Sequence, residues 1–255
     1  MAVDEAILET AGGGLVPPTL RLYAWDPPCL SLGYGQPLGD ADLDALYTHG
    51  WEVVRRATGG RAILHTDELT YSVTGPANEP RLAGSVLESY QRLSRALLRT
   101  LEILSLPAEA QENPLVAPSS DPQGPVCFEV PSNYEITVDG KKLVGSAQAR
   151  RKIGVLQHGT LPLYGDLTRI TQALVFSSAE TRERAAARLL QHATTVETVL
   201  GRIVSWEAAA EAMAQAFEQT LNLELVPAEL ALAELERAEE LVETRYSNPE
   251  WKKTR

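Results

Sequence analysis

The chain has 255 residues, of which 44% are hydrophobic and 22% charged, the composition of a soluble globular protein. This length fits one large domain, or a main domain with a small appendage. A chain of this length can bury a substantial core, so its stability needs no bound metal or disulfide bond. The 23 Lys and Arg against 34 Asp and Glu residues give a net charge of −11, which excludes a general binder of nucleic acid or anionic lipid.

The N-terminal residues and the cysteines predict a cytoplasmic protein. Residues 1–11 begin an acidic amphipathic helix and lack the basic and apolar regions of a signal peptide. No apolar run approaches the roughly 18 residues that span a membrane, so no membrane association is expected. The two cysteines, Cys29 and Cys127, are expected to stay reduced in the cytoplasm.

Between this helix and residue 75, the sequence predicts a series of short strands, over residues 19–25, 29–32, 51–55, 61–65 and 69–75. Pro27 and Pro28 separate the first two, and a turn at Gly59-Gly60 separates the third from the fourth. Residues 39–48 have helical spacing, with Asp40 or Asp42 as the cap.

The middle of the chain predicts one long helix, a long loop and a hairpin. Residues 84–105 form the helix, whose apolar face consists of Val86, Tyr90, Leu93, Leu97 and Leu101. Residues 107–126, rich in Pro, Ala, Ser and Gln, predict a loop, and loops of this length are often functional lids. Strands over 133–138 and 142–146 join at Asp139-Gly140, which favours a tight turn because both residues tolerate positive φ. A further strand covers 153–163.

From residue 166 onward the chain is mainly helical, with helices over 179–191, 205–221 and 228–246. In the last helix, an apolar stripe consists of Leu232, Leu235, Ala238 and Val242. Strands dominate before residue 165 and helices after it, with one long helix interposed. This order predicts an α/β or α+β domain with a helical C-terminal part.

Positive charge gathers in two clusters on an otherwise acidic chain. The first comprises Arg55, Arg56 and Arg61, and the second comprises Lys141, Lys142, Arg150, Arg151 and Lys152. As surface patches they would attract an acidic partner or an anionic substrate group. The alternative, solvated strand ends, stays open.

The first cluster encloses a glycine turn, RRATGGR, between two predicted strands. A glycine pair lets the backbone approach a ligand, and its N–H groups can bind a carbonyl or phosphate oxygen. A plain β-turn is the alternative, but arginines on both sides favour a binding role. The turn is no P-loop, because it lacks Gly-Lys-Ser/Thr and a helix directly after it.

A thiol, a lysine and two histidines are the candidates for chemistry. Cys127 could hold an acyl group as a thioester, although a cysteine is more often a small buried apolar residue. Lys142 could steer that chemistry or be an ordinary strand lysine. His65 and His158 could be a catalytic base and a structural hydrogen-bond partner. The four histidines and two cysteines match no zinc motif, so no metal site is expected.

Read together, three segments closely resemble the lipoate and octanoate transferase/ligase family, whose fold is shared with biotin protein ligases: RRATGGRAILHTDELTYS, CFEVPSNYE and VDGKKLVGSAQARR…GVLQHGTLPL. The resemblance extends to about residue 246, and RYSNPEW near the C-terminus also fits it. It implies an α+β fold of mixed, mostly antiparallel sheets packed with helices. It also implies a single catalytic domain over residues 1–246 and a tail over 247–255.

The branches of this family differ in their chemistry. Ligases activate free lipoate with ATP and usually carry an Asn-Asp pair where this chain has Tyr134-Glu135. Many ligases also have a C-terminal accessory domain that is missing here. The CFEVPS run instead resembles the cysteine loop of the octanoyltransferase branch common in Gram-positive bacteria. Amidotransferases, which move octanoyl groups between carrier proteins, also use a cysteine, in a different sequence context.

The resemblance to octanoyltransferases implies a two-step acyl transfer. Cys127 attacks octanoyl-acyl carrier protein, and the resulting thioester is attacked by a lysine of a glycine-cleavage H protein or of a lipoyl domain of 2-oxoacid dehydrogenases. Lys142 is expected to stabilise the thiolate and the developing oxyanion. The expected substrate-binding residues are Arg56, Thr58, Gly59, Gly60, His65, Gly145, Ser146 and His158. No cofactor is required.

Three alternatives stay open beside this reading. They are an ATP-dependent lipoate–protein ligase, an octanoyl amidotransferase, and a carrier-binding module without activity. Intact Cys127 and Lys142 argue against the last, because a binding module needs neither residue.

Overall fold

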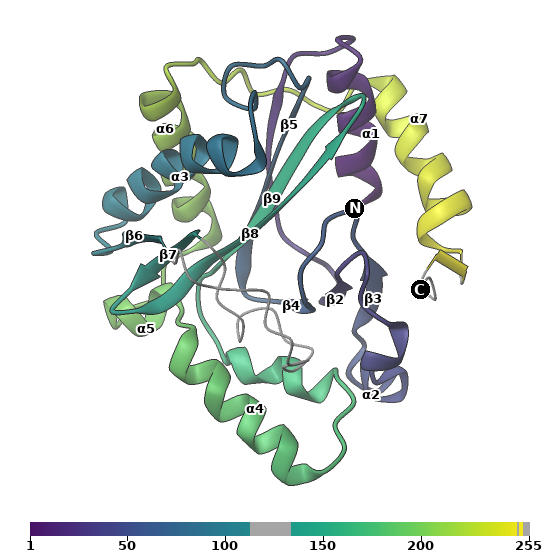
Figure 1. Ribbon diagram of the computed structural model, residues 1–255, viewed down its shortest axis with the longest axis vertical. Helices are drawn as coiled ribbons and strands as arrows, with labels where there is room; N and C mark the ends of the chain where they lie inside the picture. The colour runs from purple at the N-terminus through teal and green to yellow at the C-terminus, as the bar shows by residue number, and fades with distance from the viewer. Residues whose placement is uncertain (113–133, 249, 252–255) are drawn as a thin grey trace.

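A larger and a smaller β-sheet frame the protein (Figure 1). The computed structural model describes residues 1–112, 134–248 and 250–251. In the larger sheet every neighbouring pair of strands is antiparallel. Its strands, in spatial order, are β1 (Thr19–Tyr23), β5 (Glu68–Gly75), β9 (Gly154–Pro162), β8 (Lys141–Arg151), β7 (Tyr134–Val138) and β6 (Glu109–Glu112).

The smaller sheet has the order β3-β2-β4, with strands β2 (Cys29–Leu32), β3 (Glu52–Arg55) and β4 (Ile63–His65). β2 is parallel to β3 and antiparallel to β4. The connection from β2 to β3 contains η1 (Leu38–Asp40) and α2 (Leu43–His49). Asp42 caps α2, as one of the two predicted caps, by accepting a hydrogen bond from the Ala45 N–H at 3.0 Å.

Two helices cover one face of the larger sheet, α3 (Val86–Ile103) and α6 (Trp206–Leu221) (Figure 1). α3 begins with a capping box in which Ser85 and Glu88 bond each other's backbone N–H groups. Its face of Leu93, Leu97 and Leu101 is fully buried in the main core. Between the larger sheet and α6 the chain forms η3 (Leu167–Gln172), α4 (Ala179–His192) and α5 (Val196–Leu200).

The first and last helices, α1 (Ala2–Gly12) and α7 (Leu232–Leu241), lie side by side at the opposite edge of the molecule (Figure 1). α7 continues into a π-helical turn, η4 (Val242–Tyr246). The predicted apolar stripe of α7 is wrong in part, because Leu232 and Leu235 are exposed while Glu234 is buried. Glu234 can be buried because it accepts hydrogen bonds from the Thr10 hydroxyl at 2.9 Å and the Ala231 N–H at 2.8 Å.

The predicted hairpin is confirmed, since Asp139 and Gly140 have φ of 50° and 74°. The predicted loop is wrong where it begins, because residues 109–112 form β6 and pair with β7. Its remainder, residues 113–126, lies outside the described residues. The α+β class with mostly antiparallel sheets is confirmed. In the described part of the chain, no helix combines the length and apolar character that crossing a bilayer requires.

Candidate active site

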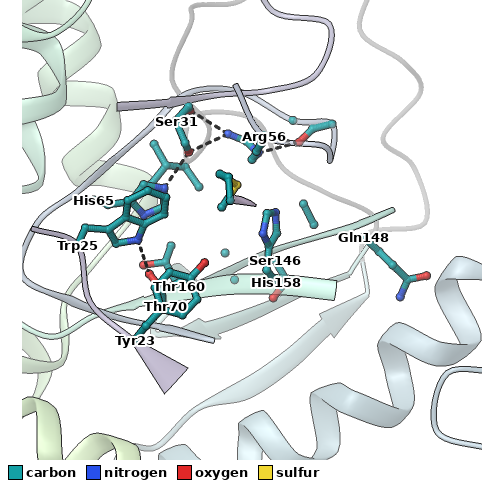
Figure 2. A pocket seen from close by; sticks show the side chains of 17 residues that line it. Tyr23, Trp25, Ser31, Arg56, His65, Thr70, Ser146, Gln148, His158 and Thr160 are labelled. Atoms are coloured by element: carbon teal, nitrogen blue, oxygen red, sulfur yellow. Dashed lines mark hydrogen bonds between the residues drawn. The ribbon is translucent and has the colours of Figure 1, made fainter. Parts of the chain in front are cut away.

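A pocket of about 250 Å³ lies where the two sheets meet. The smaller sheet contributes residues of β2, of β4 and of the turn between β3 and β4, and the larger sheet contributes β5, β8 and β9. Figure 2 shows Ser31, His65 and Trp25 on one side of this pocket and Ser146 and His158 on another. The described residues that line it are Met1, Tyr23, Trp25, Ser31, Arg56, Gly59, Gly60, Ile63, His65, Thr70, Gly145, Ser146, Ala147, Gln148, His158, Gly159 and Thr160.

Arg56 fixes the glycine turn that closes one end of the pocket. Its guanidinium donates to the carbonyls of Ser31 at 2.9 Å, Gly59 at 2.8 Å and Arg61 at 2.7 Å. The turn also requires glycine at position 33, where a Cβ would lie 1.9 Å from the Gly60 carbonyl oxygen. Arg56 therefore shapes the pocket wall through the backbone around it.

Arg55 is fully buried behind the same turn. It donates to the carbonyls of Gly33 at 2.8 Å and Gln36 at 2.5 Å, and its Nε donates to the Trp251 carbonyl at 3.1 Å. The prediction of a surface patch at the first basic cluster is therefore wrong. A loop that folds back over a sheet leaves carbonyls without ladder partners, and the guanidinium groups satisfy them.

Most of the second basic cluster also points inward. Lys141 donates to the Leu190 carbonyl at 2.7 Å, Arg150 to the Leu82 carbonyl at 2.9 Å, and Arg151 to Glu5 at 3.1 Å. Lys152 is the exposed member. Three of its members thus form hydrogen bonds within the protein while staying partly exposed.

Lys142 has a buried carboxylate beside it. Its Nζ lies 2.9 Å from Glu135 Oε1, and both side chains are about nine-tenths buried. Lys142 is not among the residues that line the pocket, although its strand β8 continues directly into Gly145 and Ser146, which do. Cys127 lies outside the described residues.

A buried carboxylate, an imidazole and a hydroxyl form a chain along the pocket wall. Glu68 Oε1 lies 2.5 Å from His65 Nδ1, and His65 Nε2 lies 2.8 Å from Ser31 Oγ. Burial would raise the pKa of Glu68, but the charge and hydrogen bond of His65 outweigh it and lower that pKa. Glu68 is therefore ionised at neutral pH.

His158 faces the same pocket from β9 and is held by two neighbours. Its Nε2 lies 2.6 Å from Thr58 Oγ1, and its Nδ1 lies 4.0 Å from the buried carboxylate of Asp4. Burial lowers the pKa of His158, and the opposing influence of Asp4 does not restore it. His158 is therefore neutral at neutral pH and acts as a hydrogen-bond partner.

Behind Ser146, a row of polar groups crosses the larger sheet. Tyr71 OH lies 2.8 Å from Ser146 Oγ and accepts from Gln157 Nε2 at 3.1 Å, and Gln148 Nε2 donates to Gln157 Oε1 at 3.0 Å. Burial raises the pKa of Tyr71 well above its ordinary value, so its hydroxyl keeps the proton. The row holds the Ser146 hydroxyl in a fixed orientation at the pocket.

The structure brings most of the predicted binding residues together, although their roles remain predictions. Those that line the pocket are Arg56, Gly59, Gly60, His65, Gly145, Ser146 and His158, and Thr58 contacts it through His158. Sequence reasoning missed Trp25, Ser31 and Glu68. Glu68 had a local signal, since it lies three residues from His65, whereas Ser31 meets His65 only through the pairing of β2 with β4.

Comparison with curated proteins shows two similar relatives over nearly the whole chain. An octanoyltransferase LipM of Kyrpidia tusciae is 44% identical over 258 residues, which cover 98% of this chain and 92% of the relative. An octanoyltransferase LipM of Brevibacillus brevis is 42% identical, with the same shares covered.

Comparison with solved structures shows the same fold in ligases. A bipartite lipoate protein ligase of Thermoplasma acidophilum has a TM-score of 0.81 at 25% identity, covering 98% of this chain and 89% of that one. A lipoate-protein ligase A bound with ATP has a TM-score of 0.77 at 27% identity, covering 98% and 91%. The lipoyl protein ligase A/B catalytic domain matches residues 1–218. The predicted resemblance is confirmed: the chain belongs to the lipoyl protein ligase A/B catalytic domain family.

Proposed function

We propose that this protein is an octanoyltransferase of lipoate biosynthesis that works through a thioester on Cys127. The donor is octanoyl-acyl carrier protein, and the acceptor is a lysine of a lipoyl domain or of a glycine-cleavage H protein. The observation that carries the proposal is the 42–44% identity to octanoyltransferases over 98% of the chain. The family's structural relatives act on lipoate, so the pocket suits a related acyl group.

In the first step the Cys127 sulfur attacks the thioester carbonyl of the donor. A new C–S bond forms, the C–S bond to the carrier breaks, and the carrier thiol leaves with the proton that Cys127 gives up. In the second step the acceptor lysine attacks the acyl-enzyme, and Cys127 is released. Each step exchanges one group at a carbonyl carbon.

Lys142 supplies positive charge for the thiolate and the oxyanion. Burial raises the pKa of Tyr90, and the charge of Lys142 works in the opposite direction. The contact with Glu135 keeps the ammonium in one place and balances its charge at rest. A cation fixed in a buried site stabilises developing negative charge more than a solvated one does.

The pocket between the sheets holds the acyl group. Backbone groups near Gly59, Gly60 and Gly145 contact its carbonyl end, and apolar surface from Trp25 and Ile63 encloses its chain. Burying the chain contributes about 0.8 kcal/mol for each methylene group. Chain length is therefore recognised by the depth of the pocket.

The test is an intact-mass measurement after incubation with octanoyl-acyl carrier protein. The wild-type protein should gain one octanoyl mass, and Cys127→Ser should not. Cys29→Ser is the matched control, because Cys29 is a buried thiol of β2 outside the proposed mechanism, and this variant should keep the adduct. An unchanged mass in active wild-type protein excludes the covalent route.

An ATP-dependent ligase is the second candidate, because solved ligases share the fold at 25–27% identity. It predicts that activity needs ATP and free lipoate and that it survives the Cys127→Ser change. An amidotransferase predicts octanoyl transfer from one lipoyl carrier to another. The same mass measurement with an octanoylated carrier as donor separates this third case.

We also propose that the protein works in the cytoplasm. The mechanism needs Cys127 as a reduced thiol, and the cytoplasm keeps thiols reduced. Loss of the octanoyl adduct under mild oxidation, with recovery on adding a reductant, would support this requirement.

A further inference from the structure

The chain formed by Glu68, His65 and Ser31 is organised to move a proton. Its three side chains come from β5, β4 and β2, and their exposed fractions are 6%, 5% and 0%. The hydrogen bond between Glu68 and His65 measures 2.5 Å, and the one between His65 and Ser31 measures 2.8 Å. His65 and Ser31 line the pocket, as Figure 2 shows, whereas Glu68 is not among its lining residues.

The charges at both ends set the direction of the hydrogen bonds. Glu68 is ionised and can only accept, so His65 donates to it from Nδ1–H. His65 Nε2 then accepts from the Ser31 hydroxyl. The Arg56 guanidinium donates to Ser31 Oγ at 3.2 Å, which favours release of the hydroxyl proton toward the ring. A proton that reaches Ser31 from the pocket thus has a path to the imidazole.

Trp25 and Thr70 hold His65 and Glu68 in place. Trp25 stacks on the imidazole, with ring centroids 4.3 Å apart and an angle of 12° between the planes. An aromatic face attracts a cation at this distance. Thr70 fixes both partners, since it donates to Glu68 at 2.6 Å and accepts from the Trp25 indole at 2.9 Å.

Other titratable groups around His65 come from each neighbouring element. Arg56 approaches from the end of β3, and His158 lies across the pocket on β9. Cys29 is the residue opposite His65 on β2, and Tyr23 lies beside Trp25. Of these, Arg56 carries its positive charge beside Ser31 Oγ.

The second step of the proposed reaction needs a base. A lysine side chain has an ordinary pKa near 10.4, so only about 0.1% of it is the free amine at pH 7.5. The ammonium form has no lone pair and cannot attack a thioester. A group near the acyl carbonyl must therefore take a proton from the acceptor.

We propose that His65, aligned by Glu68, takes this proton from the acceptor lysine through the hydroxyl of Ser31. The proposal rests on the octanoyltransferase function above. The ammonium proton passes to Ser31 Oγ while the Ser31 proton passes to His65 Nε2. The amine then forms the C–N bond, the C–S bond breaks, and the second nitrogen proton leaves with the sulfur as a thiol. The proton on His65 returns to solvent.

A purely structural role would hold β2 against β4 and leave the chemistry unaffected. A proton-accepting role affects only the second step, because only that step requires proton removal from the acceptor lysine. A structural role has no such selectivity. The two roles also differ in their dependence on the nucleophile. Hydroxylamine is uncharged near neutral pH and attacks a thioester without giving up a proton first.

The experiment uses His65→Gln, Glu68→Gln and Ser31→Ala. Each variant is acylated with octanoyl-acyl carrier protein, and the adduct is then given a lipoyl domain or hydroxylamine. We expect the ratio of the rate of transfer to the lipoyl domain to the rate of hydroxylamine turnover, measured on the same adduct, to fall by about 10²–10⁴-fold relative to wild type. His49→Gln is the matched control, because His49 is exposed and also stacks on a tryptophan, at 4.4 Å from Trp51.

The pH profile gives a second readout. Without a base, the transfer rate follows the free amine and should rise about tenfold for each pH unit between 7 and 9 in His65→Gln. The wild-type rate should rise much less over this range. A structural role predicts the same profile for both proteins.

Several outcomes would overturn the proposal. They are unchanged lysine transfer in His65→Gln, unchanged transfer in Ser31→Ala, or equal slowing with both nucleophiles in a variant that melts like wild type. The Ser31→Ala variant removes one oxygen atom and keeps the test informative if His65→Gln fails to fold. Absence of an adduct on wild-type protein would instead contradict the octanoyltransferase function itself.

Discussion

In the region around the β3–β4 turn, Arg55 and Arg56 donate to backbone carbonyls, whereas along β8 Lys142 and Arg151 pair with buried carboxylates. The two regions are alike in charge and differ in the chemistry of their partners. A carbonyl does not titrate and has no charge for salt to screen. A carboxylate does titrate, and an exposed ion pair is also weakened by salt.

This difference teaches that clustered positive charge in an acidic protein can serve its interior. In the first region the arginines fix the shape of loops that close the pocket. In the second, a lysine and its carboxylate fix a charge close to the pocket. Four predictions test the contrast.

Removing Arg55 should have the largest effect on stability. Arg55→Met removes the guanidinium bonds to the carbonyls of Gln36 and Trp251 and one of the two donors to the Gly33 carbonyl, and we expect the free energy of unfolding to fall by about 3–5 kcal/mol. Urea denaturation measures this. Arg95→Met, at an exposed position of α3, is the control and should change stability by less than about 0.5 kcal/mol. Equal effects of the two variants would contradict the assignment.

Removing Lys142 should reduce both stability and activity. Lys142→Met leaves Glu135 buried without its cation, at a cost of about 3 kcal/mol in the free energy of unfolding. Adding Glu135→Gln should restore at least about half of that stability. Acylation of Cys127, followed by intact mass, should stay about 10²–10³-fold slower in both variants. Normal acylation in the double variant would show that Lys142 is only structural.

Lowering the pH should weaken the stabilisation from carboxylate ion pairs but not that from hydrogen bonds to carbonyls. Burial would raise the pKa of Asp4, but the hydrogen bond of His158 and the charges of the N-terminal amine and Arg21 outweigh it and hold that pKa well below its ordinary range. The unfolded chain therefore binds a proton at Asp4 below about pH 4 that the folded protein does not, and stability falls as the pH is lowered.

Between pH 5 and 3 the wild-type protein should lose about 1 kcal/mol of stability that Asp4→Asn does not lose. The destabilisation caused by Arg55→Met should stay constant over the same range, because its partners are carbonyls. Urea denaturation at each pH provides the data. Parallel pH slopes for Asp4→Asn and wild type would count against the Asp4 assignment.

The smallest effect belongs to Arg151. Its side chain is 34% exposed, and its partner Glu5 also receives hydrogen bonds from Arg245 and Tyr246. Arg151→Met should cost about 0.5–1 kcal/mol, less at high salt. Lys152→Met, at the exposed neighbouring position, serves as the baseline. A fall in the free energy of unfolding as large as that caused by Arg55→Met would contradict the difference proposed between the two regions.

Local patterns in the sequence were sufficient for most of the framework. Alternating strands, the helix around Leu97 and the Asp139-Gly140 turn carry signals within a few residues. β6 was missed because residues 109–112 (EAQE) contain no β-branched or aromatic residue. The stripe on α7 failed because burial of Glu234 depends on Thr10, which is 224 residues away.

The site was predictable where it coincides with family motifs. Gly59, His65 and Ser146 belong to such motifs and do line the pocket. The burial of the Arg55 side chain was not predictable, because its partners are backbone carbonyls, which every residue has and no sequence pattern marks. Ser31 was missed because the register of β2 on β4 brings it to His65 across 34 residues.

The pairing of α1 with α7 has a consequence for how the protein is made. Glu5 is buried in α1, and among its partners are Arg245 and Tyr246, which follow it by 240 and 241 residues. A ribosome adds about 5–20 residues per second, so α1 waits about 10–50 s for these partners. During that interval Glu5 must stay hydrated, and α1 cannot settle on the sheet in its final form. The packing of α1 against its final partners therefore waits until Arg245 and Tyr246 have been synthesised, and stalling before residue 245 leaves Glu5 without these two partners.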